Sequence, residues 1–200
     1  MTKLRKAIFL AGHFDKKDTS MWENWFITID NLFKEYGLFA HRIEVAGEGY
    51  TGRIYCRNRL LKKLNNSFAE KKVFERIGLY SYDPKHEHVN NNDMVLFLRY
   101  FDFFEHDIIW CEFNEDTFSD EEIDKIISVL EKFIDITYGE LIQQNKSTNN
   151  IMFISRAFNY KLGDGPVDED LRKEMDLTTL KIIKEESIPK QYYCDDINVL

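Results

Sequence analysis

The pattern of apolar and polar positions along the chain predicts alternating strands and helices. Residues 6–11 form a short apolar run, which is typical of a buried strand. Apolar residues then recur at spacings of three and four over residues 22–36, which predicts a helix that stops at Gly37. Ser20 and Glu23 have the spacing of a capping box, with Ser20 as the N-cap of this helix.

The middle of the chain predicts further strands and one more helix. In order, the pattern indicates a strand at residues 38–45, a glycine-rich turn at 46–52, a helix at 58–72, a strand at 74–82 and a polar loop at 83–93. Two strands follow at residues 94–100 and 107–113. Their short connection favours an antiparallel pair, because a parallel pair needs a longer crossover.

A second capping box joins Ser119 to Glu122 and begins a helix whose apolar stripe runs to Ile134. Residues 151–157 predict the last strand, and residues 171–186 predict another helix. This order predicts an α+β fold, a mixed or antiparallel sheet of about five to six strands covered by three to four helices. We expect one globular domain over residues 1–200, in which 167–200 is either part of the domain or an appended helical tail.

Composition and charge narrow the classes of protein. The chain has 200 residues, and its 44% hydrophobic and 31% charged residues are ordinary for a globular domain. The net charge of −8 weighs against a general nucleic-acid binder and against anionic membrane surfaces. No segment approaches the roughly 20 apolar residues of a membrane span, and the first apolar run is too short for a signal peptide. We therefore expect a cytoplasmic protein.

The strongest functional feature is an acidic and aromatic stretch. Residues 102–140 contain 13 Asp and Glu side chains, opposed only by Lys125 and Lys132, with several Phe and Trp among them. Acidic charge with rigid aromatic surface suits docking onto a basic protein partner. The expected partner-binding residues are Asp102, Glu105, Asp107, Glu112, Glu115, Asp116, Phe118, Asp120, Glu121 and Asp124. The alternative stays open that the aromatics belong to the core and the acids serve helix starts and solubility.

Signals for catalysis or a cofactor are weak. Residues 47–52 match the letters G-x-G-x-x-G, but Glu48 would stand where a pyrophosphate must bind, so a glycine turn is the better interpretation. His86 and His88, and also His13 with Asp15, lack an obvious third metal ligand. The three cysteines are widely spaced, and Cys111 is expected in the core. We assign no catalytic residue, no metal ligand and no cofactor.

Residues 53–76 form the one strongly basic segment, with Arg53, Arg59, Lys62 and Lys63 among its cations. It is the best candidate for binding nucleic acid. Given the acidity of the whole chain, we favour a solvated helix face that pairs with the acidic segment of the same molecule.

In general character the chain resembles the immunity proteins of bacterial polymorphic-toxin, contact-dependent and type VI secretion systems. The resemblance lies in a small, acidic single domain with capped aromatic helices and no catalytic motif, as in Ser20-Met-Trp-Glu-Asn-Trp-Phe. It implies tight inhibition of a cognate toxin, often by covering a basic active-site cleft, and it carries no residue roles. Two other hypotheses remain: an enzyme that is hydrolytic or metal-dependent, and a nucleic-acid-associated module that uses residues 53–76.

Overall fold

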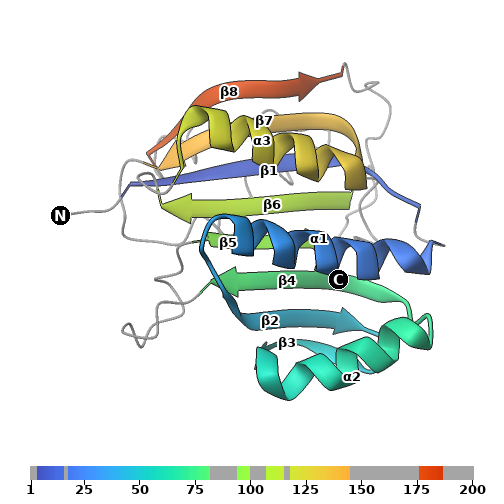
Figure 1. The fold of residues 1–200 in the computed structure, drawn as a ribbon. Helices are drawn as coiled ribbons and strands as arrows, with labels where there is room; N and C mark the ends of the chain where they lie inside the picture. Colours follow the sequence, from blue (N-terminus) through green and yellow to red (C-terminus); the bar gives the residue numbers. More distant parts are fainter. Residues whose placement is uncertain are drawn as a thin grey trace, which may run out of the picture.

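Eight strands and three α-helices make up the described part of the chain (Figure 1). The computed structural model describes residues 4–15, 18–81, 94–99, 107–114, 118–144 and 176–186. The strands are β1 (Arg5–His13), β2 (Ala40–Gly47), β3 (Tyr50–Cys56), β4 (Phe74–Ser81), β5 (Met94–Arg99), β6 (Asp107–Asn114), β7 (Asp135–Gln144) and β8 (Leu177–Glu185). The helices are α1 (Thr19–Glu35), α2 (Arg57–Ala69) and α3 (Asp120–Leu130), followed by the short 3₁₀ helix η2 (Glu131–Phe133).

The strands form one sheet in the order β3-β2-β4-β5-β6-β1-β7-β8, and every neighbouring pair is antiparallel. The α+β class is confirmed, and so is the antiparallel pairing of β5 with β6. The expected count of five to six strands was too low. The first strand of the chain, β1, lies deep in the sheet between β6 and β7.

All three helices lie on one face of the sheet, with α1 over its middle and α2 and α3 toward opposite ends (Figure 1). The helix-facing side chains of the strands and the apolar stripes of the helices form one buried cluster. Trp22, Trp25, Ile29 and Phe33 recur at helical spacing on α1 and are buried there, as their periodicity predicts. The indole of Trp25 donates a hydrogen bond to the carbonyl oxygen of Ile77 at 3.2 Å, so its polar atom is satisfied inside the core.

The two predicted helix starts have different outcomes. The capping box of α3 is present, since Ser119 and Glu122 bond to each other in both directions. The N-cap of α1 is Asp18 rather than Ser20, because the Asp18 carboxylate accepts hydrogen bonds from the backbone and hydroxyl of Ser20. The Oδ1 atom of Asp18 therefore replaces the expected serine hydroxyl as the cap. Gly37 follows α1 with a φ of 68°, the left-handed conformation expected at a helix end.

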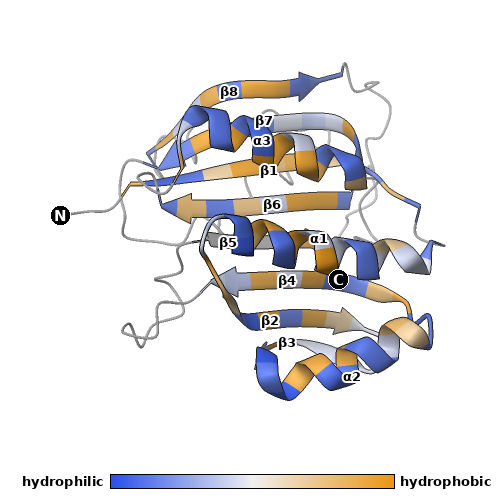
Figure 2. Cartoon of the chain, in the orientation of Figure 1, coloured by the Kyte–Doolittle hydropathy of each residue, from blue (hydrophilic) through white to orange (hydrophobic). Residues whose placement is uncertain are grey.

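The second face of the sheet also buries its central side chains. Phe9 on β1 contacts the rings of Trp110 and Tyr138, with ring centroids 6.1 and 6.3 Å away. Arg5 forms an ion pair with Glu112 there, and the two side chains are only 10% and 1% exposed. Burial on both faces explains why β1 is apolar without alternation from Ala7 to Ala11 (Figure 2).

Three strands differ from the elements predicted by pattern. The glycine turn at 46–52 is narrower than expected, and Tyr50 to Cys56 continue from it as β3, paired with β2. The helix α3 ends at Leu130, before the expected Ile134, and the strand β7 that follows at Asp135 was not predicted. The segment expected as a helix at 171–186 contains β8, which pairs with β7 as an edge strand. The sequence of β8 is ambiguous because most of its side chains are exposed, so no buried face imposes a period of two.

The predicted strand at 151–157 and the predicted loop at 83–93 lie outside the described residues. In the described ranges, no helix is long and apolar enough to cross a membrane.

Glu112 provides a test of the packing on the second face. Replacement with Gln removes the charge that pairs with the buried Arg5 guanidinium, which is expected to lower the free energy of unfolding by about 3–5 kcal/mol. Urea denaturation measures this change. The exposed Glu121 is the matched control, and Glu121→Gln is expected to change stability by less than about 0.5 kcal/mol. Equal losses of unfolding free energy in Glu112→Gln and Glu121→Gln would contradict a stabilising role for the Arg5–Glu112 pair.

Candidate functional site

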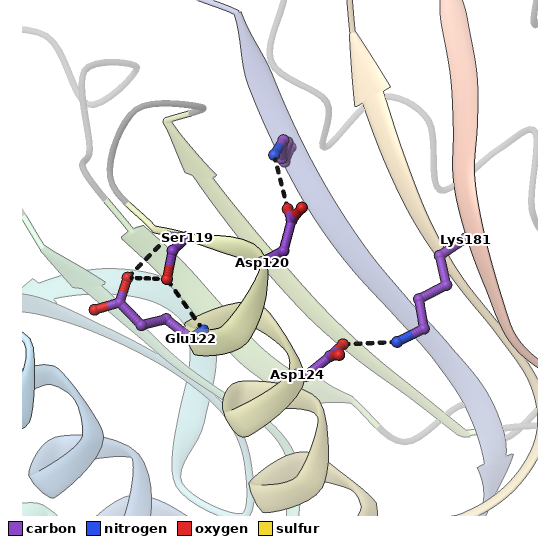
Figure 3. Close-up of polar contacts among 6 residues, drawn as sticks. Ser119, Asp120, Glu122, Asp124 and Lys181 are labelled. Atoms are coloured by element: carbon purple, nitrogen blue, oxygen red, sulfur yellow. Dashed lines mark hydrogen bonds and ion pairs between the residues drawn. The ribbon is translucent and has the colours of Figure 1, made fainter.

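The first turn of α3 presents exposed acidic side chains in the folded protein (Figure 3). The Glu122 carboxylate accepts a hydrogen bond from the backbone N–H of Ser119 at 2.8 Å, and Ser119 Oγ accepts one from the backbone of Glu122 at 3.4 Å. This reciprocal cap fixes the direction in which the helix begins. Asp120, Glu121 and Asp124 are exposed on the turn that it fixes.

The charge of Glu122 is stabilised by the same cap. The hydrogen bond from the Ser119 backbone, and next the one from its hydroxyl, lower the pKa of Glu122 below its ordinary value of 4.5. The positive end of the α3 dipole also favours anions at this place. The start of α3 therefore holds fixed negative charge at neutral pH.

Two lysines from the sheet reach the acids of α3 (Figure 3). Lys6 on β1 lies with its Nζ 3.7 Å from Asp120 Oδ1, and Lys181 on β8 lies with its Nζ 2.7 Å from Asp124 Oδ1. The Asp120 side chain is 95% exposed and Asp124 is 59% exposed. Exposed ion pairs of this kind contribute about 0–1 kcal/mol each, so a partner's cation can replace the lysines at small cost.

A groove of about 450 Å³ runs between α3 and the sheet at this point. We call it the α3 groove, lined by Lys6, Asp120, Ile123, Asp124, Leu141, Gln143, Leu180 and Lys181. Its floor is apolar, and Leu180 within it is 44% exposed. The groove therefore combines an apolar floor with charged side chains of both signs at its edge.

Three of the expected partner-binding residues are not at the surface. Asp107, Glu112 and Phe118 are 1%, 1% and 5% exposed. Phe118 packs edge-on against Phe113 and Tyr36, with ring centroids 5.1 and 4.7 Å away. The prediction that Asp107, Glu112 and Phe118 lie on a docking surface is therefore wrong, because the packed strands and helices cover all three side chains.

The remaining expected residues divide into two sets. Asp120, Glu121 and Asp124 are exposed and lie together at α3. The others fall outside the described residues, and they are Asp102, Glu105, Glu115 and Asp116. The candidate site is thus smaller than the acidic stretch of the sequence.

Sequence reasoning missed the sheet side of the groove. Lys6, Leu141, Leu180 and Lys181 come from β1, β7 and β8, which lie far apart in sequence. β7 and β8 were not predicted as strands, so nothing placed these residues beside α3. The alternation of Thr178, Leu180 and Ile182 was a weak signal for a strand in this region.

The G-x-G-x-x-G segment forms a β-hairpin. Gly47 and Gly49 have φ values of 130° and 82° at the tight connection between β2 and β3. A dinucleotide site needs a strand that leads into a helix N-terminus, whereas the segment here joins two paired strands. The glycine-turn interpretation is confirmed.

Metal and thiol candidates give no site within the described ranges. There, no three His, Cys, Asp or Glu side chains are grouped to hold a metal ion, and His86 and His88 fall outside those ranges. Cys111 is fully buried, and burial raises the pKa of its thiol well above its ordinary value. Cys111 is a core residue, as expected.

Within the described residues, the basic segment forms its ion pairs with acids outside the acidic stretch. α2 packs over β2 and β3, and α3 lies at the other end of the sheet (Figure 1). Instead, Arg57 pairs with Asp30 on α1, and Arg76 pairs with Glu44 on β2. Burial acts to raise the pKa of Asp30, but hydrogen bonds from Arg57 and Lys34 outweigh it and lower the pKa. The expected pairing does not occur between α2 and α3, because the intervening strands separate them, and Asp102, Glu105, Glu115 and Asp116 lie outside the described residues.

Comparisons with family models, curated proteins and solved structures find no match to this chain.

The α3 cap gives a prediction for stability and its pH dependence. Ser119→Ala is expected to cost about 1 kcal/mol, since an N-cap hydroxyl is lost. Because the folded pKa of Glu122 is lowered, its charge stabilises the fold above pH 4.5, and this contribution is lost as the pH falls further. The difference in unfolding free energy between the wild type and Glu122→Gln should therefore shrink below about pH 4.5.

Urea titrations between pH 3 and 7 measure both effects. Ser128→Ala is the matched control, because Ser128 is exposed in the middle of α3 and bonds only backward to the Asp124 carbonyl oxygen at 2.9 Å. Equal losses for Ser119→Ala and Ser128→Ala, or a Glu122→Gln difference that does not change with pH, would contradict the role of the cap.

Proposed function

We propose that this chain is an immunity-type inhibitor that binds a cognate toxin through the toxin's basic surface and neutralises it. The observation that carries the proposal is the set of exposed acids Asp120, Glu121 and Asp124 beside the α3 groove. In this proposal the protein acts in the cytoplasm as a stoichiometric binding protein, without a cofactor.

The acids can guide the first encounter. Three carboxylates on one helix turn create a local negative field that attracts a basic surface and speeds association. The capping box holds the turn in place, so little conformational freedom is lost when the partner binds. Asp120 and Glu121 stand at the outer end of this turn, where a long cationic side chain reaches them first.

The groove can supply the anchor. An arginine of the toxin has an aliphatic stem that fits the apolar floor at Ile123, Leu141 and Leu180. Its planar guanidinium can bond a carboxylate with two parallel hydrogen bonds, which the Lys181 ammonium cannot do for Asp124. Replacement of Lys181 by such an arginine therefore favours the complex.

The test uses the protein encoded immediately upstream of this chain, coexpressed and purified with it. In a variant with Asp120→Lys, Glu121→Lys and Asp124→Lys, association is expected to slow by at least about tenfold at low salt, because the steering field is reversed. Stopped-flow fluorescence at several salt concentrations measures the rate, and growth of cells that produce both proteins measures protection.

A matched control reverses charge elsewhere, with Glu23→Lys, Glu48→Lys and Glu75→Lys at exposed positions of α1, the β2–β3 turn and β4. This variant has the same net charge as the first, so it separates a local surface from an effect of total charge. An association rate that falls equally in both variants contradicts the α3 surface. Failure of the wild type to bind or protect contradicts the inhibitor function itself.

A further inference from the structure

The outer face of α2 is basic although the protein as a whole is acidic. Its 13 residues, RNRLLKKLNNSFA, include four Arg and Lys and no Asp or Glu. Leu60, Leu64 and Phe68 face the core, so Arg59, Lys62 and Lys63 fall on the opposite side and are exposed. Arg53 on the neighbouring edge strand β3 is exposed as well.

Three other cations of this region are already neutralised within the protein. Arg57 bonds Asp30 with Nη2 to Oδ2 at 3.0 Å, and Arg76 reaches Glu44 at 2.6 Å. Lys72 pairs with Glu70 at 2.8 Å, after the end of α2. The exposed cations on α2 and β3 are Arg53, Arg59, Lys62 and Lys63, which we call the α2 basic face, and Lys71 is exposed just beyond the end of α2.

Acids are distant from most of this face. The acidic turn of α3 lies at the other end of the sheet (Figure 1). Glu48 and Glu70 are close to the C-terminal end of α2, where Glu48 donates its backbone N–H to Val73 and Glu70 bonds Lys72. Among the described residues, Asp30 compensates Arg57 at the start of α2, and no acid forms an ion pair with Arg59, Lys62 or Lys63.

The chemistry of the α2 basic face favours nucleic acid over protein. Its exposed neighbours on the helix are amides, Asn58, Asn65 and Asn66, rather than aromatic side chains. Protein interfaces depend on aromatic and apolar anchors, whereas nucleic-acid interfaces are polar and strongly positive. Arg, Lys and Asn are also the side chains that bond phosphate oxygens.

The absence of exposed aromatic rings on α2 also bears on the kind of nucleic acid. Binding of single strands uses aromatic side chains on which bases stack. Tyr50, the aromatic residue next to Lys63, is only 8% exposed and lies under the Lys63 ammonium at 4.2 Å from the ring centre. We propose that the α2 basic face binds the phosphate backbone of a nucleic-acid duplex, without preference for its sequence.

The probe is a fluorescently labelled 20-base-pair DNA duplex, titrated with the full chain between 20 and 200 mM salt. Three to four phosphate contacts predict a slope of about −3 for the logarithm of affinity against the logarithm of salt concentration. The triple variant Arg59→Gln, Lys62→Gln, Lys63→Gln is expected to weaken binding at least tenfold at 20 mM salt and to reduce the slope. Gln preserves helix propensity at these positions.

The matched control is Lys125→Gln, Lys132→Gln, Lys184→Gln, which removes the same charge near α3 and β8. It should bind the duplex as the wild type does. If Lys63→Gln disturbs the fold through its bond to the Gly49 carbonyl oxygen, the double variant Arg59→Gln, Lys62→Gln tests the same face.

Four outcomes overturn the proposal. They are no binding of the duplex at 20 mM salt, equal loss in both triple variants, tighter binding of the corresponding single strand, and self-association of the wild type at low salt that the α2 variant abolishes. The last outcome would assign the α2 basic face to the acidic turn of a second copy of the chain. The experiment needs no toxin, so its failure leaves the proposed inhibitor function standing.

Discussion

The insertion of β1 between β6 and β7 is the constraint on which the rest of the structure depends. The first strand of the chain joins the strands that precede and follow α3, and pairs with both along most of its length. Gly12 permits this approach, because a Cβ atom there would stand 2.0 Å from the backbone oxygen of Asp135. A slip of one residue in the register of β1 would exchange the side chains that pack on its two buried faces, and it would move Lys6 away from α3.

This placement separates the two charged surfaces. From β1 the chain passes through α1 to β2, which lies across β4, β5 and β6 in the sheet, so α2 covers one end. β7 and β8 extend the sheet beyond β1 on the other side, and α3 covers that end (Figure 1). Lys6 and Lys181 partly balance the acids of α3, while Asp30 balances Arg57 and no described acid forms an ion pair with Arg59, Lys62 or Lys63. A chain of net charge −8 therefore presents a basic end and an acidic end, and each can meet a different partner.

The sequence predicted those parts of the fold in which one face of an element meets the core. The stripe of α1 and the capping box of α3 are visible in neighbouring residues, and both are present. β8 was predicted as a helix because its pairing with β7 is not encoded by a local period. The candidate site was predicted in part. Asp120, Glu121 and Asp124 follow from the helix start, whereas the burial of Glu112 depends on Arg5, more than 100 positions earlier in the chain. Long-range pairing of this kind leaves no local signal in the sequence.

The central claim is that the acidic turn of α3 and the α2 basic face are separate binding surfaces. The most direct measurement is a pair of amide chemical-shift titrations of the isotope-labelled protein, one with a lysine-rich peptide and one with the DNA duplex. The account predicts that the peptide shifts amides of residues 119–124 and 178–182, and that the duplex shifts amides of residues 53–66, with little overlap. Shifts of the same amides with both ligands would contradict it.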